Sequence, residues 1–68
     1  RFRGNLVPGW EVGLYHNDRL IGYQSSTVES QYDFVDVPIL FGRNYFRLVF
    51  YGPQWQVREQ EEVFELGQ

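Results

Sequence analysis

The chain of 68 residues contains no cysteine, lysine, alanine or methionine. Without cysteine, neither a disulfide nor a thiolate zinc site can stabilise it. The same absence does not identify the cellular compartment. The net charge is −3 and the six arginines are scattered, whereas a surface that follows nucleic-acid phosphates needs clustered basic residues. We therefore expect no nucleic-acid partner.

Long apolar runs and helical patterns are also missing. No stretch approaches the roughly 20 consecutive apolar residues of a membrane span, so we expect no membrane insertion by this segment. Apolar residues do not recur at helical spacing over three turns. The first residues, RFRGNL, include neither an initiator methionine nor a signal-peptide pattern. We expect residues 1–68 to form a single module excised from a larger multi-domain protein.

The chain is instead rich in aromatic residues, with six Phe, five Tyr and two Trp. A domain of this size buries only roughly 60% of its unfolded surface, and each aromatic side chain can bury on the order of 150–250 Å². Apolar and polar residues alternate in several short segments, which is typical of half-buried strands. Gly, Pro, Asn and Asp separate these segments, as at HNDR (16–19) and Gly52-Pro53. These patterns predict an all-β fold.

The predicted strands lie near residues 2–7, 10–16, 19–25, 31–36, 43–51 and 55–65. In the last segment the two valines occupy odd positions, whereas Phe64 and Leu66 occupy even positions. This change of face predicts a bulge or break near EQEE. In 43–51, Arg47 marks the outward face, because an unpaired charge is expensive to bury. The predicted core comprises Trp10, Val12, Leu14, Tyr32, Phe34, Val37, Phe46, Leu48 and Phe50.

Several segments in succession resemble a known family. PGWEVGLYHNDRLIGYQ, YDFVDVP, FGRNYFRLVFYGP and QVRE are similar to the transthyretin-like, immunoglobulin-like repeats of large bacterial surface and envelope proteins, which are relatives of carboxypeptidase-regulatory-like and collagen-adhesin B-type modules. The resemblance covers residues 3–60. The chain departs from the family pattern in two places. VESQYDF lacks a glycine before the aromatic strand, and Trp55 stands where a small residue such as glycine is usual.

The resemblance implies a small immunoglobulin-like or transthyretin-like β-sandwich of six to seven short antiparallel strands. It also implies a non-catalytic repeat that acts as a spacer or protein-interaction platform, located at the cell surface, outer membrane or periplasm of a bacterium. The expected partners are neighbouring domains of the same chain and a protein or glycan ligand. We expect no enzymatic activity and no cofactor.

Outward aromatic residues are the candidate interaction surface, because contiguous exposed apolar surface usually marks an interface. The candidates are Trp55, Tyr51, Tyr45, Val49 and Tyr15. A covering loop or a neighbouring repeat is the alternative explanation for the outward tyrosines, and Trp55 could instead fold back over the end of the sandwich. The competing function is a small β-domain that binds glycan or extended peptide through Trp55, Tyr51 and Tyr45. An SH3-like barrel is a third possibility, which fits the strand succession less well.

Other chemistry has weaker support in the sequence. His16, the single histidine, is expected to be a solvated turn residue. It can be combined with Asp18 and one of the nearby serines into a nominal triad, but no nucleophile motif surrounds them. The acidic residues supply oxygen atoms of the kind that calcium prefers, yet no calcium-loop motif is present, so we expect a solvated face. Those acidic residues are Glu29, Asp33, Asp36, Glu59, Glu61 and Glu62.

Overall fold

The computed structural model describes residues 1–67, which form six β-strands and contain no helix. The strands are β1 (Phe2–Asn5), β2 (Glu11–His16), β3 (Arg19–Ser25), β4 (Gln31–Phe34), β5 (Gly42–Tyr51) and β6 (Val57–Leu66). Each begins and ends within two residues of the bounds that the alternation pattern predicts. The predicted all-β class is confirmed. Among the described residues, no helix is long and apolar enough to span a membrane.

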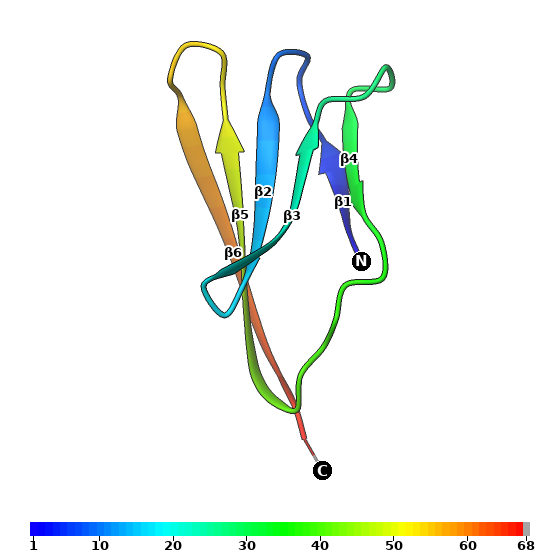
Figure 1. The fold of residues 1–68 in the computed structure, drawn as a ribbon, viewed down its shortest axis with the longest axis vertical. Helices are drawn as coiled ribbons and strands as arrows, with labels where there is room; N and C mark the ends of the chain where they lie inside the picture. The colour runs from blue at the N-terminus through cyan, green and yellow to red at the C-terminus, as the bar shows by residue number, and fades with distance from the viewer. Residues whose placement is uncertain (68) are drawn as a thin grey trace.

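The strands form two antiparallel sheets (Figure 1). One sheet pairs β1 with β4, and the other has the order β3-β2-β5-β6. The ring of Phe2 in β1 lies 4.9 Å from that of Phe46 in β5, and the ring of Tyr32 in β4 lies 5.7 Å from that of Phe50. Because these aromatic contacts join the two sheets, the arrangement is compatible with a small β-sandwich.

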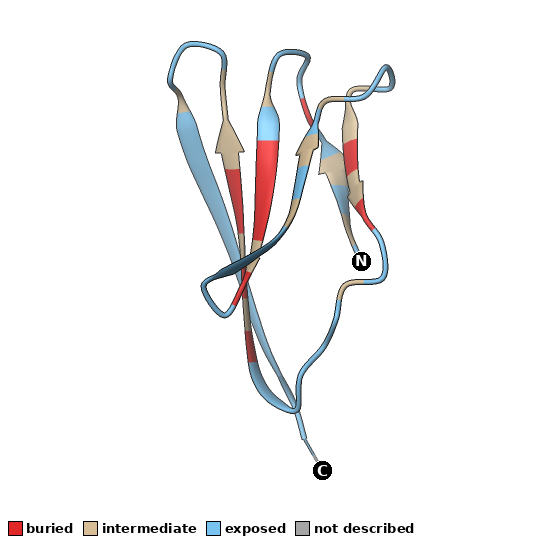
Figure 2. Cartoon of the chain, viewed as in Figure 1, coloured by how far each residue is buried: buried red, intermediate tan, exposed pale blue. Residues whose placement is uncertain are grey.

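The hydrophobic core lies between the two sheets, and its buried part follows β2, β4 and β5 (Figure 2). Six of the nine predicted core residues are buried in this cluster, and the other three, Trp10, Val37 and Phe50, are partly buried and pack against it. The prediction missed Leu6, which is buried in the cluster, and Phe2, which packs against it. In RFRGNL the inward positions are Phe2, Gly4 and Leu6, so a glycine interrupts the apolar pattern. That glycine is needed because the Tyr32 hydroxyl oxygen lies 2.8 Å from where a β-carbon would be.

The turn between β2 and β3 is formed as predicted. Asn17 and Asp18 adopt φ values of 48° and 65°, the left-handed conformations of a tight hairpin. A register shift in this hairpin lies between Leu14 and Tyr15, because Leu14 pairs with Gly22 while Tyr15 pairs with Leu20. One extra residue, Ile21, is thus accommodated in β3 as a bulge.

The bulge or break predicted near EQEE is wrong. β6 pairs with β5 without a register shift, from Tyr51 opposite Val57 to Gly42 opposite Leu66. The apolar residues can move from odd to even positions without a register shift, because β6 is an edge strand that is exposed along its whole length (Figure 2). Both of its faces can therefore carry apolar residues, and the ring of Phe64 stacks on that of Phe46 at 5.7 Å.

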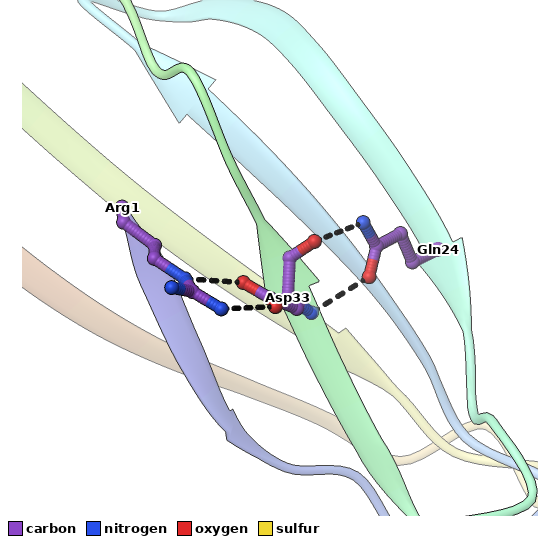
Figure 3. A network of polar contacts seen from close by, with 3 residues as sticks. All are labelled: Arg1, Gln24 and Asp33. Carbon is purple, nitrogen blue, oxygen red and sulfur yellow. Dashed lines mark hydrogen bonds and ion pairs between the residues drawn. The ribbon is translucent and has the colours of Figure 1, made fainter.

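A side chain connects the edges of the two sheets. The amide of Gln24 in β3 donates from Nε2 to the carbonyl of Asp33 in β4 at 2.7 Å, and its Oε1 accepts from the Asp33 N–H at 2.9 Å (Figure 3). The two bonds imitate a backbone ladder between strands that are not themselves paired. This link fixes β4 beside β3 and leaves β1 as the outer strand of the small sheet.

Candidate interaction surfaces

Trp55 lies at the tip of the hairpin that joins β5 to β6. The Gly52 N–H donates to the Gln56 carbonyl at 2.8 Å and closes the loop, and the Gln54 N–H donates to Gln56 Oε1 at 2.8 Å. The Trp55 side chain is 96% exposed. It therefore makes no contribution to the core, and the alternative in which it folds back over the sandwich end is wrong.

The backbone at Trp55 has a φ of 67°. This left-handed conformation favours glycine, and it costs a bulky residue about 1 kcal/mol. The expectation that a glycine is usual at this position thus has a physical reason in the turn geometry. Trp55 adds conformational strain and exposes a large apolar surface, so folding gains nothing evident from the indole.

The predicted outward residues of β2 and β5 share the face opposite the core. Val49 pairs with Gly13, and Arg47 pairs with Tyr15. Val49 is nevertheless buried at 4% exposed, because Gly13 carries no side chain and neighbouring rings fill the space above it. Ring atoms of Tyr15 and Tyr23 lie 3.5 and 3.6 Å from the β-carbon position of Gly13. Val49 therefore lies beneath the tyrosine rings and is not exposed to a partner.

Four half-buried or exposed tyrosines form the rest of this surface, which we call the tyrosine face: Tyr15, Tyr23, Tyr45 and Tyr51. The Tyr23 ring lies 6.3 Å from that of Tyr51 in a stacked arrangement. The Arg47 guanidinium carbon lies 4.5 Å from the centre of the Tyr15 ring, a cation–π contact. Tyr23 was not among the predicted residues. Tyr23 alternates with Gly22 and Gln24, but this pattern places Tyr23 on the outward face only when the bulge at Ile21 is taken into account.

Three tyrosines on this face, Tyr23, Tyr45 and Tyr51, have a pKa raised above the ordinary value, so their hydroxyls stay protonated at neutral pH. The Tyr23 hydroxyl donates to Glu11 Oε1 at 2.7 Å, and this hydrogen bond raises the Tyr23 pKa above its ordinary value. The neighbouring Tyr15 hydroxyl, together with burial, raises the pKa of Tyr51. Burial and the carboxylate of Glu61 raise the pKa of Tyr45. The face therefore presents neutral phenols beside the charged groups of Glu11 and Arg47.

His16 is not the solvated turn residue that was expected. It is 6% exposed, its ring stacks on Phe46 at 4.4 Å, and its Nε2 lies 2.8 Å from Asn44 Oδ1. The Ser26 hydroxyl donates to the Leu6 carbonyl at 2.6 Å. Because His16 Nε2 bonds to Asn44 and the Ser26 hydroxyl bonds to the Leu6 carbonyl, the structure does not assemble the nominal triad with Asp18.

The acidic residues do not converge into a metal centre in the part of the chain that the structure describes, residues 1–67. Asp33 instead accepts two hydrogen bonds from the Arg1 guanidinium, at 2.7 and 2.9 Å (Figure 3). The hydrogen bonds from Arg1 lower the pKa of Asp33 below its ordinary value. Glu59 accepts from Arg47 at 2.8 Å.

An open hollow of about 470 Å³ separates β1 from β6. The aromatic side chains of Trp10 and Phe50 contribute apolar surface to it, and Arg58 and Glu59 contribute charge. The complete lining comprises Asn5, Leu6, Val7, Trp10, Phe50, Arg58, Glu59 and Gln60. The small sheet has two strands while the large sheet has four, and β6 stays exposed along its length within residues 1–67.

No protein-family model, no curated protein sequence and no solved structure matches this chain.

Proposed function

We propose that this chain is a non-catalytic structural and interaction module of a larger bacterial surface or envelope protein. The six antiparallel strands in two sheets support this proposal, together with the resemblance of its turn and strand motifs to transthyretin-like, immunoglobulin-like repeats. In this role the module spaces neighbouring domains of the same chain, and it presents a surface to a protein or glycan ligand.

The observation that carries the interaction role is the conformation of Trp55. An indole that is 96% exposed at a left-handed position stabilises neither the core nor the turn. Strained or exposed residues of this kind cluster at binding sites, where the surrounding structure maintains them. Trp55 therefore acts as the contact residue at the hairpin tip.

The tyrosine face favours a second candidate function, the binding of glycan or extended peptide. Aromatic rings stack on the apolar faces of sugars and on extended chains. The tyrosine face supplies such rings, while Glu11 at the Tyr23 hydroxyl and Arg47 over the Tyr15 ring supply hydrogen-bonding groups within it. Both candidates are non-catalytic, and they differ in the residues that contact the ligand.

Array binding tests both candidates. The labelled 68-residue chain is applied to a glycan array and to an array of extended peptides, in parallel with Trp55→Ala and Tyr15→Ala. We expect a ligand whose binding to Trp55→Ala is lost, while the melting temperature changes little. Loss in Tyr15→Ala with retention in Trp55→Ala would assign the ligand to the tyrosine face. An array without any ligand for the native chain would contradict the interaction role.

A further inference from the structure

Among residues 1–67, no strand pairs with the outer edge of β6, so its outward backbone groups have no strand partner along the ten residues Val57–Leu66. The Gly52 N–H donates to the Gln56 carbonyl, so even-numbered residues of β5 and β6 bond to each other across the hairpin. Backbone groups alternate in direction along a strand. The N–H and C=O groups of the odd-numbered residues of β6 therefore point away from β5, at Val57, Glu59, Glu61, Val63 and Glu65.

Exposed strand edges are templates for the addition of another strand. Proteins block such an edge with proline, a bulge, a covering loop or charged side chains, and in residues 57–66 β6 has only the last of these. Because these charges are mostly acidic, they disfavour an acidic strand and leave the edge open to a basic one. Three of the five residues whose backbone groups point to this edge are glutamates. Apolar side chains flank this acidic centre: Val57 and Val63 on one face, and Phe64 and Leu66 on the other, all of them exposed.

We propose that the free edge of β6 binds an extended peptide strand in which basic residues alternate with apolar residues. This inference rests on the proposed interaction role and names the class of partner. On an added strand, basic side chains lie beside Glu61 and Glu65, because directly opposed side chains share one face of a sheet. The apolar side chains of the added strand then fall on the other face, where Phe64 and Leu66 are exposed.

A second copy of the chain fits this edge poorly. Antiparallel pairing of two β6 strands through their outward-pointing odd-numbered residues, with Val57 opposite Glu65, places Glu61 of one copy directly opposite Glu61 of the other. Like charges in directly opposed positions are destabilising, and each chain carries a net charge of −3. The charge pattern therefore disfavours self-pairing and favours a basic strand from another polypeptide.

The probe for this site is an acetylated and amidated octapeptide of alternating lysine and valine, with the glutamate–valine octapeptide as its matched control. Amide chemical shifts of the 68-residue chain are followed by NMR during titration. We expect the lysine peptide to shift the amides of β6 and to protect the odd-numbered amides of 57–65 from exchange. The glutamate peptide should leave them unchanged.

Two variants and one modified peptide sharpen the test. Glu61→Lys should weaken binding by about fivefold, since cross-strand ion pairs contribute up to about 1 kcal/mol. Glu29→Lys, which makes the same charge change in the β3–β4 loop, should leave binding unchanged. A lysine peptide that is N-methylated on the residues whose N–H groups face β6 should not bind, because it cannot complete the ladder.

Three results would overturn the proposal: equal binding of both peptides, shifts confined to other strands, or concentration-dependent self-pairing of β6. These results are separable from failure of the proposed function. A native chain that binds an array ligand through Trp55 but ignores the lysine peptide keeps its interaction role and loses only the β6 site.

Discussion

Asn44 is completely buried and makes four hydrogen bonds. Its Oδ1 accepts from the Leu40 N–H at 2.8 Å, and its Nδ2 donates to the carbonyls of Leu40 and Gly42 at 2.8 and 3.2 Å. The two bonds to Leu40 fix the orientation of the amide, so that Nε2 of His16 is the donor to Oδ1. One side chain thus holds the loop before β5 against the β2–β3 turn.

Replacing Asn44 with alanine should lower the free energy of unfolding by about 2–4 kcal/mol. The substitution leaves the Leu40 N–H and His16 Nε2 without their acceptor, and unsatisfied buried groups cost about 1–3 kcal/mol each. Urea unfolding measures the change. Asn5→Ala, at the exposed end of β1, is the matched control and should stay within about 0.5 kcal/mol of the native chain. Equal stability of both variants would contradict this role.

The burial of His16 could not be predicted from its sequence context. HNDR correctly predicts a turn, and turn residues are usually solvated. The ring is buried because Asn44, 28 positions away, supplies a polar partner, and because Phe46 offers its face for stacking. Neither contact is visible until β2 and β5 are known to be neighbours.

At the scale of elements, an ion pair joins Arg1, the residue before β1, to β4. Arg1 bonds Asp33, and the hydrogen bonds hold the pKa of Asp33 below its ordinary value of 3.8. A carboxylate with a lowered folded-state pKa contributes stability above its unfolded pKa and loses it as the pH falls through the folded pKa. The contribution should therefore be complete near neutral pH and should decline below about pH 4.

Replacing Asp33 with asparagine tests this pH dependence. The side chain keeps its size, and the backbone link to Gln24 is unaffected because it uses main-chain atoms of residue 33. We expect the native chain to have the higher melting temperature at pH 7, with a difference that narrows as the pH falls below 3.8. High salt should also reduce the difference, since both side chains are largely exposed. A difference that does not depend on pH would contradict the assignment.

The strand positions could be predicted from the sequence because period-two alternation and turn residues act locally. The prediction failed where the cause is not local. The bulge expected in β6 is absent because both faces of an edge strand can be exposed. The bulge that the structure has lies at Ile21 in β3, where the pattern of apolar residues did not predict one. The link through Gln24 likewise depends on which sheet edges meet.

The whole molecule is an elongated body of 42 × 22 × 14 Å. The β1–β2, β3–β4 and β5–β6 loops lie at one end, and the chain leaves β6 at the other (Figure 1). The loop end exposes isolated apolar side chains, with Val28 95% and Trp55 96% exposed. This shape suits the proposed role of a spacer that presents contact residues at its tip. The exposure of Trp55 could not be predicted from composition, because it depends on the hairpin geometry.

Urea unfolding of Trp55→Gly, measured beside Trp55→Ala, tests most directly whether the indole is free of any role in folding. We predict that Trp55→Gly is at least as stable as the native chain, because the indole makes no core contact and glycine adopts a φ of 67° without strain. Trp55→Ala should be less stable than Trp55→Gly by up to about 1 kcal/mol. A loss of about 3 kcal/mol or more in both variants, as truncation of a core tryptophan produces, would show that Trp55 serves folding and would contradict the account.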